Sequence, residues 1–255
     1  MTAPVKFSIQ LAELRAVALA AANQDLRFYL NAVAFDFARD GLYLVATDGH
    51  RLHAIKAQVG DPQAITALTG STIIVPADTI KQVKPPARTK LTSVEVAIEP
   101  AKNDNGEATH RVTFTVGGAS QTALAIIHRY PDWRRVLPRP ASVSIRHDNP
   151  GATVYPQYLA DAHNAISILT SAKLPGFQYH FVEPSRGVVK EGQAPNTSAS
   201  GVYVLGLPVG GARDFVAFIM PYGYVGKGKP VVFDLPDWLS PPPPQQVKTL
   251  ATLFD

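Results

Sequence analysis

The chain has 255 residues, of which 46% are hydrophobic and 17% charged, and its net charge is +4. This composition is typical of a folded protein with one large or two small domains, and it excludes a disordered chain. No apolar run reaches the roughly 18 residues of a membrane-spanning helix, and the start lacks the pattern of a secretory signal. The absence of cysteine excludes disulfides and thiolate metal sites, and it suits a cytoplasmic protein.

The first part of the chain predicts a strand, a helix and three further strands. Apolar residues at helical spacing follow a strand at Lys6–Gln10 and predict a helix over Leu11–Ala22. Alternating side chains then predict three strands joined by short turns, with Asp40-Gly41 as a hairpin signal. These strands cover Asn31–Ala38, Leu42–Thr47 and His50–Ala57.

The same order of elements is predicted twice more. In the second unit a strand at Ser71–Pro76 leads into a helix over Ala77–Lys84, which Pro85-Pro86 ends. Three strands follow, at Ser93–Glu99, His110–Val116 and Gln121–His128. The third unit begins near Ala152 with a short strand and a helix over Pro156–Leu169. Its later strands are predicted near Phe177–Val182, Val202–Leu205 and Asp214–Met220. A unit repeated three times predicts an α+β fold of antiparallel sheets with short helices on one side.

Five segments of the chain carry a resemblance to a known family. Asn23–Asn31 and the run Ala-Thr-Asp-Gly-His-Arg-Leu from Ala46 are similar to the middle domain of the bacterial DNA polymerase III β sliding clamp, and Tyr130–Pro138 is similar to the stretch that closes that domain. Tyr155–Ser167 and Phe215–Tyr222 resemble the second helix and the closing strand of its last domain. The family's first domain has no counterpart in the chain, and the first half of its third domain is expected to be missing or reduced to Pro140–Gly151.

The resemblance implies a clamp domain at residues 1–138, a truncated clamp domain at 139–224 and a C-terminal extension at 225–255. It also implies an apolar pocket where short peptides of polymerases and of the clamp loader dock. Carried over residue by residue, the pocket comprises Thr47, Gly49, His50, Arg51, Leu52, Pro131, Arg135, Val136, Met220 and Pro221. Leu250–Phe254 partly matches a clamp-binding peptide, so the end of the chain either docks in such a pocket or is an ordinary terminus.

The resemblance further implies non-enzymatic binding to double-stranded DNA without base readout, as a processivity factor that tethers a polymerase. Basic residues on and after the second helix are the candidates to face DNA, namely Lys81, Lys84, Arg88 and Lys90. The chain is expected to form an oligomer and to need no cofactor or metal.

Two other functions stay open from the sequence. One is a clamp-derived adaptor or competitor that binds such peptides without forming a ring. The other is an enzyme on a similar scaffold. For the latter, Asp48-Gly49-His50 lacks a third catalytic or metal-binding partner, and the residues predict a tight turn in which Asp48 accepts backbone hydrogen bonds and Gly49 has a positive φ.

Overall fold

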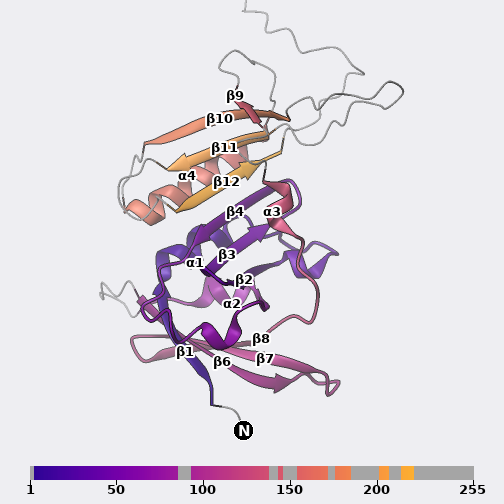
Figure 1. Ribbon diagram of the computed structural model, residues 1–255, viewed down its shortest axis with the longest axis vertical. Helices are drawn as coiled ribbons and strands as arrows, with labels where there is room; N and C mark the ends of the chain where they lie inside the picture. Colours follow the sequence, from indigo (N-terminus) through magenta and orange to yellow (C-terminus); the bar gives the residue numbers. More distant parts are fainter. Residues whose placement is uncertain are drawn as a thin grey trace, which may run out of the picture. The chain divides into compact units, whose positions relative to one another are not determined.

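The structure is a computed structural model that describes residues 3–85, 93–137, 143–145, 154–171, 176–184, 201–206 and 214–220 (Figure 1). All of these residues belong to one compact unit, residues 1–223. The predicted tail at 225–255, and with it Leu250–Phe254, lies outside the described residues. Within the described ranges, no helix is both long enough and apolar enough to cross a membrane.

The strand–helix–strand–strand–strand unit occurs three times, as predicted. The first unit contains β1 (Val5–Gln10), α1 (Leu11–Ala18), β2 (Ala32–Ala38), β3 (Gly41–Thr47) and β4 (Arg51–Lys56). The second contains β5 (Thr72–Pro76), α2 (Ala77–Gln82), β6 (Ser93–Lys102), β7 (Ala108–Val116) and β8 (Ala119–Leu124). The third contains β9 (Val143–Ile145), α4 (Pro156–Thr170), β10 (Phe177–Pro184), β11 (Gly201–Gly206) and β12 (Phe215–Ile219). A short helix, α3 (Trp133–Val136), lies between the second and third units, and single 3-10 turns occur at Phe28–Leu30 and Thr66–Leu68.

Several predicted boundaries were wrong, and the ends of α1 and β8 differ most among them. α1 ends at Ala18 rather than Ala22, because Ala20 and Ala21 make short i→i−3 bonds and the amide of Ala22 donates to the Leu30 carbonyl instead. β8 begins directly after the Gly117-Gly118 turn and ends at Leu124, before the chain crosses to β5. The strand predicted near Ala152 lies outside the described residues, and the first described strand of the third unit is β9, inside the stretch expected to be missing or reduced.

The units exchange strands within two antiparallel sheets. In the described part of the chain, one sheet has the order β1-β6-β7-β8 and the other the order β5-β2-β3-β4-β12-β11-β10-β9. The first two units therefore swap their opening strands, since β1 pairs with β6 and β5 pairs with β2. The third unit joins the first through the antiparallel pair β4·β12, in which Leu52 lies opposite Phe218.

Alternation along the strands divides the interior into two cores. On β2, Val33, Phe35 and Phe37 face the main core, which also contains the apolar sides of α1, α2 and α4. Ala32 and Ala34 face the opposite side of the sheet, where Tyr130 and Trp133 cover a smaller core. Because side chains alternate between the two faces of a strand, the larger set is covered by helices and the smaller set by the segment around α3.

Candidate functional site

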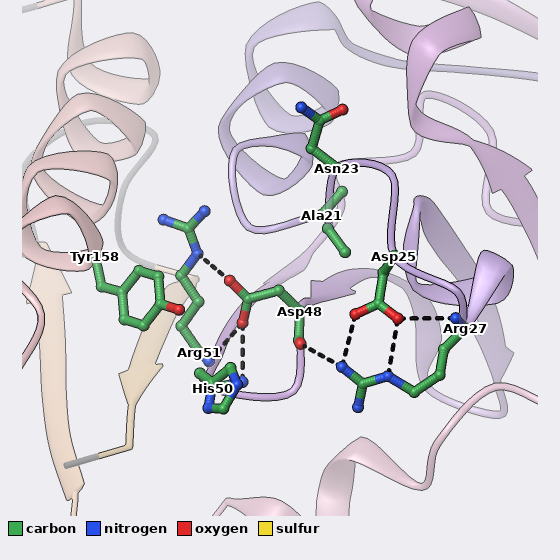
Figure 2. Close-up of a pocket in the computed structure, with 9 residues that line it drawn as sticks. Ala21, Asn23, Asp25, Arg27, Asp48, His50, Arg51 and Tyr158 are labelled. Atoms are coloured by element: carbon green, nitrogen blue, oxygen red, sulfur yellow. Dashed lines mark hydrogen bonds and ion pairs between the residues drawn. The ribbon is translucent and has the colours of Figure 1, made fainter. Parts of the chain in front are cut away.

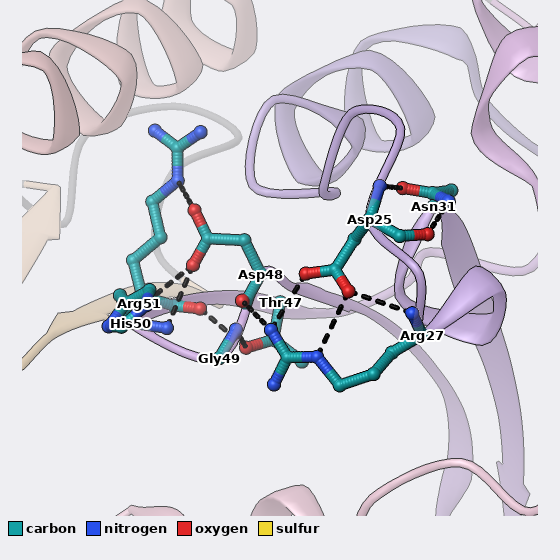
Figure 3. A network of polar contacts seen from close by, with 8 residues as sticks. All are labelled: Asp25, Arg27, Asn31, Thr47, Asp48, Gly49, His50 and Arg51. Carbon is teal, nitrogen blue, oxygen red and sulfur yellow. Dashed lines mark hydrogen bonds and ion pairs between the residues drawn. The ribbon is translucent and has the colours of Figure 1, made fainter.

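The turn between β3 and β4 is held by its own side chains (Figure 3). The carboxylate of Asp48 accepts hydrogen bonds from the backbone N–H groups of His50 and Arg51, at 2.9 and 3.0 Å. The hydroxyl of Thr47 accepts the Gly49 N–H at 3.0 Å and donates to the Arg51 carbonyl at 2.6 Å. Gly49 has φ +92°, a value that favours glycine. The prediction of a tight turn at Asp48-Gly49 is confirmed.

A second loop, between α1 and β2, is tied to this turn. The guanidinium of Arg27 binds the Asp25 carboxylate at 2.7 and 3.1 Å and donates to the Asp48 carbonyl at 3.2 Å. A β-carbon at Gly49 would lie 3.0 Å from this guanidinium, so the close contact also favours glycine. Hydrogen bonds from Arg27 lower the pKa of Asp25 to about 2. Asn31 closes the loop through two backbone bonds with Asp25.

Arg51 joins the turn to the third unit. Its side chain binds Asp48 at 3.1 Å and also pairs with Asp161 on α4, and its guanidinium carbon lies 4.6 Å from the ring centroid of Tyr158. The side chains of Arg51 and Asp161 are only 10% and 14% exposed, so this is a partly buried ion pair rather than a surface one. Gln157 donates to the second carboxylate oxygen of Asp161 at 3.0 Å.

Several of these groups line an open cavity of about 350 Å³ (Figure 2). It is lined by Ala21, Ala22, Asn23, Asp25, Arg27, Asp48, His50, Arg51 and Tyr158. Of the residues predicted to form a peptide pocket, only His50 and Arg51 line this cavity. Asp25, Arg27 and Tyr158 were not predicted as site residues, although the first two lie in the Asn23–Asn31 run that signalled the family.

The apolar members of the predicted pocket lie on the other side of the turn. Leu52 is 2% exposed and belongs to the smaller core beneath Tyr130 and Trp133. Pro131 and Val136 are half-buried, whereas Arg135 is exposed. The half-buried Met220 donates its backbone N–H to the His50 carbonyl at 2.8 Å, which brings the end of β12 to the turn. Pro221 lies outside the described residues.

The segment around α3 is fastened to the sheet by Trp133. Its indole N–H donates to the carboxylate of Asp36 on β2 at 2.9 Å, and Arg134 pairs with the same carboxylate. The Arg134 guanidinium carbon lies 4.1 Å from the Trp133 ring centroid and 4.9 Å from that of Tyr43 on β3. These contacts hold Pro131–Val136 beside the β3–β4 hairpin.

Two buried titratable groups stabilise α1, namely Glu13 on the helix itself and His53 on β4. The Glu13 carboxylate accepts backbone bonds from Gln58 at 3.0 Å and Gln10 at 3.3 Å, and burial raises its pKa to about 7. His53 is fully buried, and burial lowers its pKa to about 4. Its Nδ1 lies 3.0 Å from the Ala16 carbonyl, so Nδ1 carries the proton and donates to one of the free carbonyls at the end of α1.

The predicted DNA-facing residues are only partly described. Lys81 and Lys84 are exposed on and just after α2, and Lys81 pairs with Asp78 at 2.9 Å. Arg88 and Lys90 lie outside the described residues. Arg15 on α1 donates to the Val83 carbonyl at 3.1 Å and so connects the two helices. Among the described residues, no three His, Asp or Glu side chains gather as a possible metal site.

The fold is that of a DNA sliding clamp. A crystal structure of the DNA polymerase sliding clamp from Pseudomonas aeruginosa superposes with a TM-score of 0.56 at 20% identity, over 87% of this chain and 67% of that one. Residues 9–132 match the family described as DNA polymerase III beta subunit, central domain. The predicted resemblance to the β sliding clamp is therefore confirmed for the segment that contains the β3–β4 turn.

Two relatives give the extent of the similarity. The beta sliding clamp of Proteus mirabilis is 31% identical over 157 residues, which are 61% of this chain. The beta sliding clamp of Escherichia coli K12 is 27% identical over 183 residues, which are 70% of this chain. The chain covers 37% of the first relative's length and 44% of the second's.

Proposed function

We propose that this protein is a non-enzymatic, sliding-clamp-like processivity factor that acts on double-stranded DNA in the cytoplasm. The observation that carries the proposal is the match of residues 9–132 to the central domain of the polymerase III β subunit. We assign residues 1–138 to a complete clamp domain and residues 139–224 to half of another. Tethering raises the effective concentration of a polymerase at its template, and this requires binding surfaces but no catalytic group.

Peptide docking beside the β3–β4 turn is the first part of the proposed function. Three separate segments meet there: the turn itself, the start of α3 and the end of β12, which the Met220–His50 backbone bond joins to the turn. Pro131, Val136 and Met220 are half-buried and offer apolar surface, while the exposed His50 and Arg135 offer polar contacts for an extended peptide. Partners with such peptides would include a DNA polymerase and a clamp loader.

Fluorescence anisotropy with two labelled peptides tests this part. One peptide has the chain's own end, Leu-Ala-Thr-Leu-Phe, and the other has glutamine in place of its first leucine. We expect saturable binding that Met220→Ala, His50→Ala and Arg135→Ala each weaken by about tenfold, a loss of roughly 1.4 kcal/mol. Arg111→Ala on the distant strand β7 is the control and should bind normally. Saturable binding that ignores all three site variants would contradict peptide docking at this turn.

Non-specific DNA contact is the second part of the proposed function. Lys81 and Lys84 are both exposed, and Lys81 forms a surface ion pair with Asp78. Because both ammonium groups are accessible, they can contact phosphates without base contacts. The test is gel-filtration retention of the protein on nicked circular DNA and on the same DNA after linearisation. A clamp that encircles DNA stays on the circle and slides off the linear form. Equal retention on both forms argues against encirclement, and retention on neither, with peptide binding intact, would favour the adaptor.

A further inference from the structure

One carboxylate on β2 lies on the face of the sheet that α3 covers. Ala32, Ala34 and Asp36 occupy alternate positions of this strand, so their side chains lie on the face opposite the main core. The two alanines are buried, whereas the side chain of Asp36 is 16% exposed. In the register of β2 and β3, Asp36 lies opposite Tyr43. An aspartate and a tyrosine therefore stand side by side where the row of buried alanines ends.

Asp36 binds two neighbouring residues of α3 at the same time. Its Oδ2 accepts the indole N–H of Trp133 at 2.9 Å and also pairs with the guanidinium of Arg134. The guanidinium carbon lies 4.1 Å from the ring centroid of Trp133 and 4.9 Å from that of Tyr43, and the two rings are 5.5 Å apart. One carboxylate oxygen thus holds together a cluster of a cation and two aromatic rings.

α3 has few local means of holding its direction. It consists of four residues, and a single helical turn is not stable by itself because helix nucleation is unfavourable. In the described part of the chain, the side chain of Asp132 does not cap the turn. Trp133 and Leu137 pack against the smaller core, but apolar burial is non-directional. Hydrogen bonds are directional, so the bonds to Asp36 are the contacts that can set the orientation of α3.

The orientation of α3 decides where two residues of the proposed docking site lie. Arg135 is exposed and Val136 is half-buried, and both belong to the same helical turn as the residues that Asp36 binds. A rotation that broke the bonds to Asp36 would therefore move both. Asp36 itself is remote from the β3–β4 turn. It lies opposite Tyr43, and from there β3 runs four residues to Thr47, about 13 Å at roughly 3.3 Å per residue.

We propose that Asp36 is a positioning residue of the docking site, which acts through Trp133 and Arg134 to fix the orientation of α3. The inference rests on the peptide docking proposed above, and it adds a residue that the peptide does not touch. Without the carboxylate, α3 keeps its buried indole but samples several orientations, and only the fraction in the native orientation binds. The apparent affinity falls with that fraction. Association slows by the same factor, whereas dissociation does not change, because the bound peptide then holds α3 in place.

Stopped-flow fluorescence anisotropy with labelled Gln-Ala-Thr-Leu-Phe separates the two rate constants. Asp36→Ala should lower the association rate constant about tenfold and change the dissociation rate constant by less than about twofold. Asp36→Glu returns a carboxylate to the same face and should restore most of the association rate. Arg135→Ala removes a direct contact with the peptide, so it should instead speed dissociation.

Asp40→Ala is the matched control for these measurements. Asp40 is an exposed carboxylate in the turn between β2 and β3, and it binds Tyr43 at 2.7 Å and Lys56 at 3.3 Å. Its described contacts do not include α3, so the variant should bind the peptide as the wild type does. If Asp36→Ala fails to fold, Arg134→Ala truncates an exposed side chain instead. It should slow association in the same direction by a smaller factor, because the Trp133 bond to Asp36 remains.

The fluorescence of Trp133 reports on α3 without any peptide. The chain has two tryptophans, and Trp238→Phe as the background leaves Trp133 alone. Trp133 is 8% exposed, so iodide should quench its emission weakly in this background. Quenching should be stronger when Asp36→Ala is added, because a turn released from the sheet exposes the indole more often. Adding Asp40→Ala should leave the quenching unchanged.

The outcomes distinguish this inference from the function on which it rests. A wild type that does not bind the peptide would contradict docking itself, and the inference with it. Wild-type binding with equal association rates for Asp36→Ala and Asp40→Ala would overturn the role of Asp36 alone. Faster dissociation of Asp36→Ala at an unchanged association rate would also overturn it, because Asp36 would then act within the complex. The same holds for slower association with unchanged quenching of Trp133, since α3 would not have been released.

Discussion

Glu13 and His53 are two buried side chains whose ionisation is coupled to folding at moderate pH. Glu13, on α1, is 3% exposed and accepts a hydrogen bond from the backbone of Gln58. His53 is completely buried and contacts the Ala16 carbonyl of α1. Burial disfavours the charged form in both cases, so it raises the pKa of the carboxyl and lowers that of the imidazole. The two groups therefore act on stability in opposite directions as the pH changes.

Glu13→Gln should remove the loss of stability that the wild type shows as the pH rises from 4.5 to about 7. Folding raises the pKa of Glu13 from 4.5 to about 7, so its contribution is complete below pH 4.5 and is lost as the pH rises to about 7. At roughly 1.4 kcal/mol per pKa unit, about 3 kcal/mol is lost across this window. Urea unfolding of the wild type and the variant between pH 4 and 8 measures the difference. Glu99→Gln, at a partly exposed carboxylate on β6, is the control.

In the Glu13→Gln variant, His53 should determine how the free energy of unfolding depends on pH between about 4 and 6.5. Folding lowers the pKa of His53 from 6.5 to about 4, so its contribution is present above pH 6.5 and is lost as the pH falls to about 4. The variant should therefore lose stability steadily on acidification, whereas in the wild type the two trends partly cancel. Parallel pH curves for wild type and variant would show that the Glu13 carboxylate is not the group responsible.

Arg51 is predicted to contribute more to stability than a surface arginine. Arg51→Ala leaves Asp48 without its arginine and Asp161 without its cation, and it removes the contact with Tyr158. We expect a loss of about 2–4 kcal/mol in the free energy of unfolding, near the range for breaking partly buried pairs. Arg111→Ala breaks the exposed pair with Glu99 and should cost less than about 1 kcal/mol. Equal costs for the two variants would mean that the Arg51 contacts are energetically like surface pairs.

At the level of elements, local pattern was sufficient for most strands and for the β3–β4 turn. Val33, Phe35 and Phe37 alternate with smaller residues because only one face of β2 meets the main core, and this is visible in the sequence. The turn was predictable because Asp48 and Gly49 act on their immediate neighbours. The end of α1 was not, since Ala20–Ala22 are good helix formers and only the Leu30 carbonyl, supplied by a later loop, diverts the chain.

The candidate site was predicted less completely than the fold, because its contacts join distant segments. Nothing local to Arg51 indicates Asp161, and nothing local to Asp36 indicates Trp133. The resemblance supplied the turn residues, but it placed them around an apolar pocket. A separate cavity beside the turn is lined in part by charged side chains, and the apolar pocket stays a prediction.

At the scale of the molecule, the pair β4·β12 joins the third unit to the first. Within the described residues, strands of all three units therefore belong to one eight-stranded sheet. The apolar sides of α1, α2 and α4, one helix from each unit, all contribute to the main core. The three units thus share both a sheet and a core.

The exchange of β1 and β5 between the first two units has a consequence for how the chain is made. Val5 on β1 lies opposite Ile98 on β6, so β1 leaves the ribosome well before its partner strand in the second unit has been synthesised. Contacts so distant along the chain are slow to form, and the entropy of closing the loop between them is lost before any hydrogen bond compensates for it. Neither of the first two units can complete its sheet without a strand from the other. The two units are therefore synthesised one after the other but must fold together.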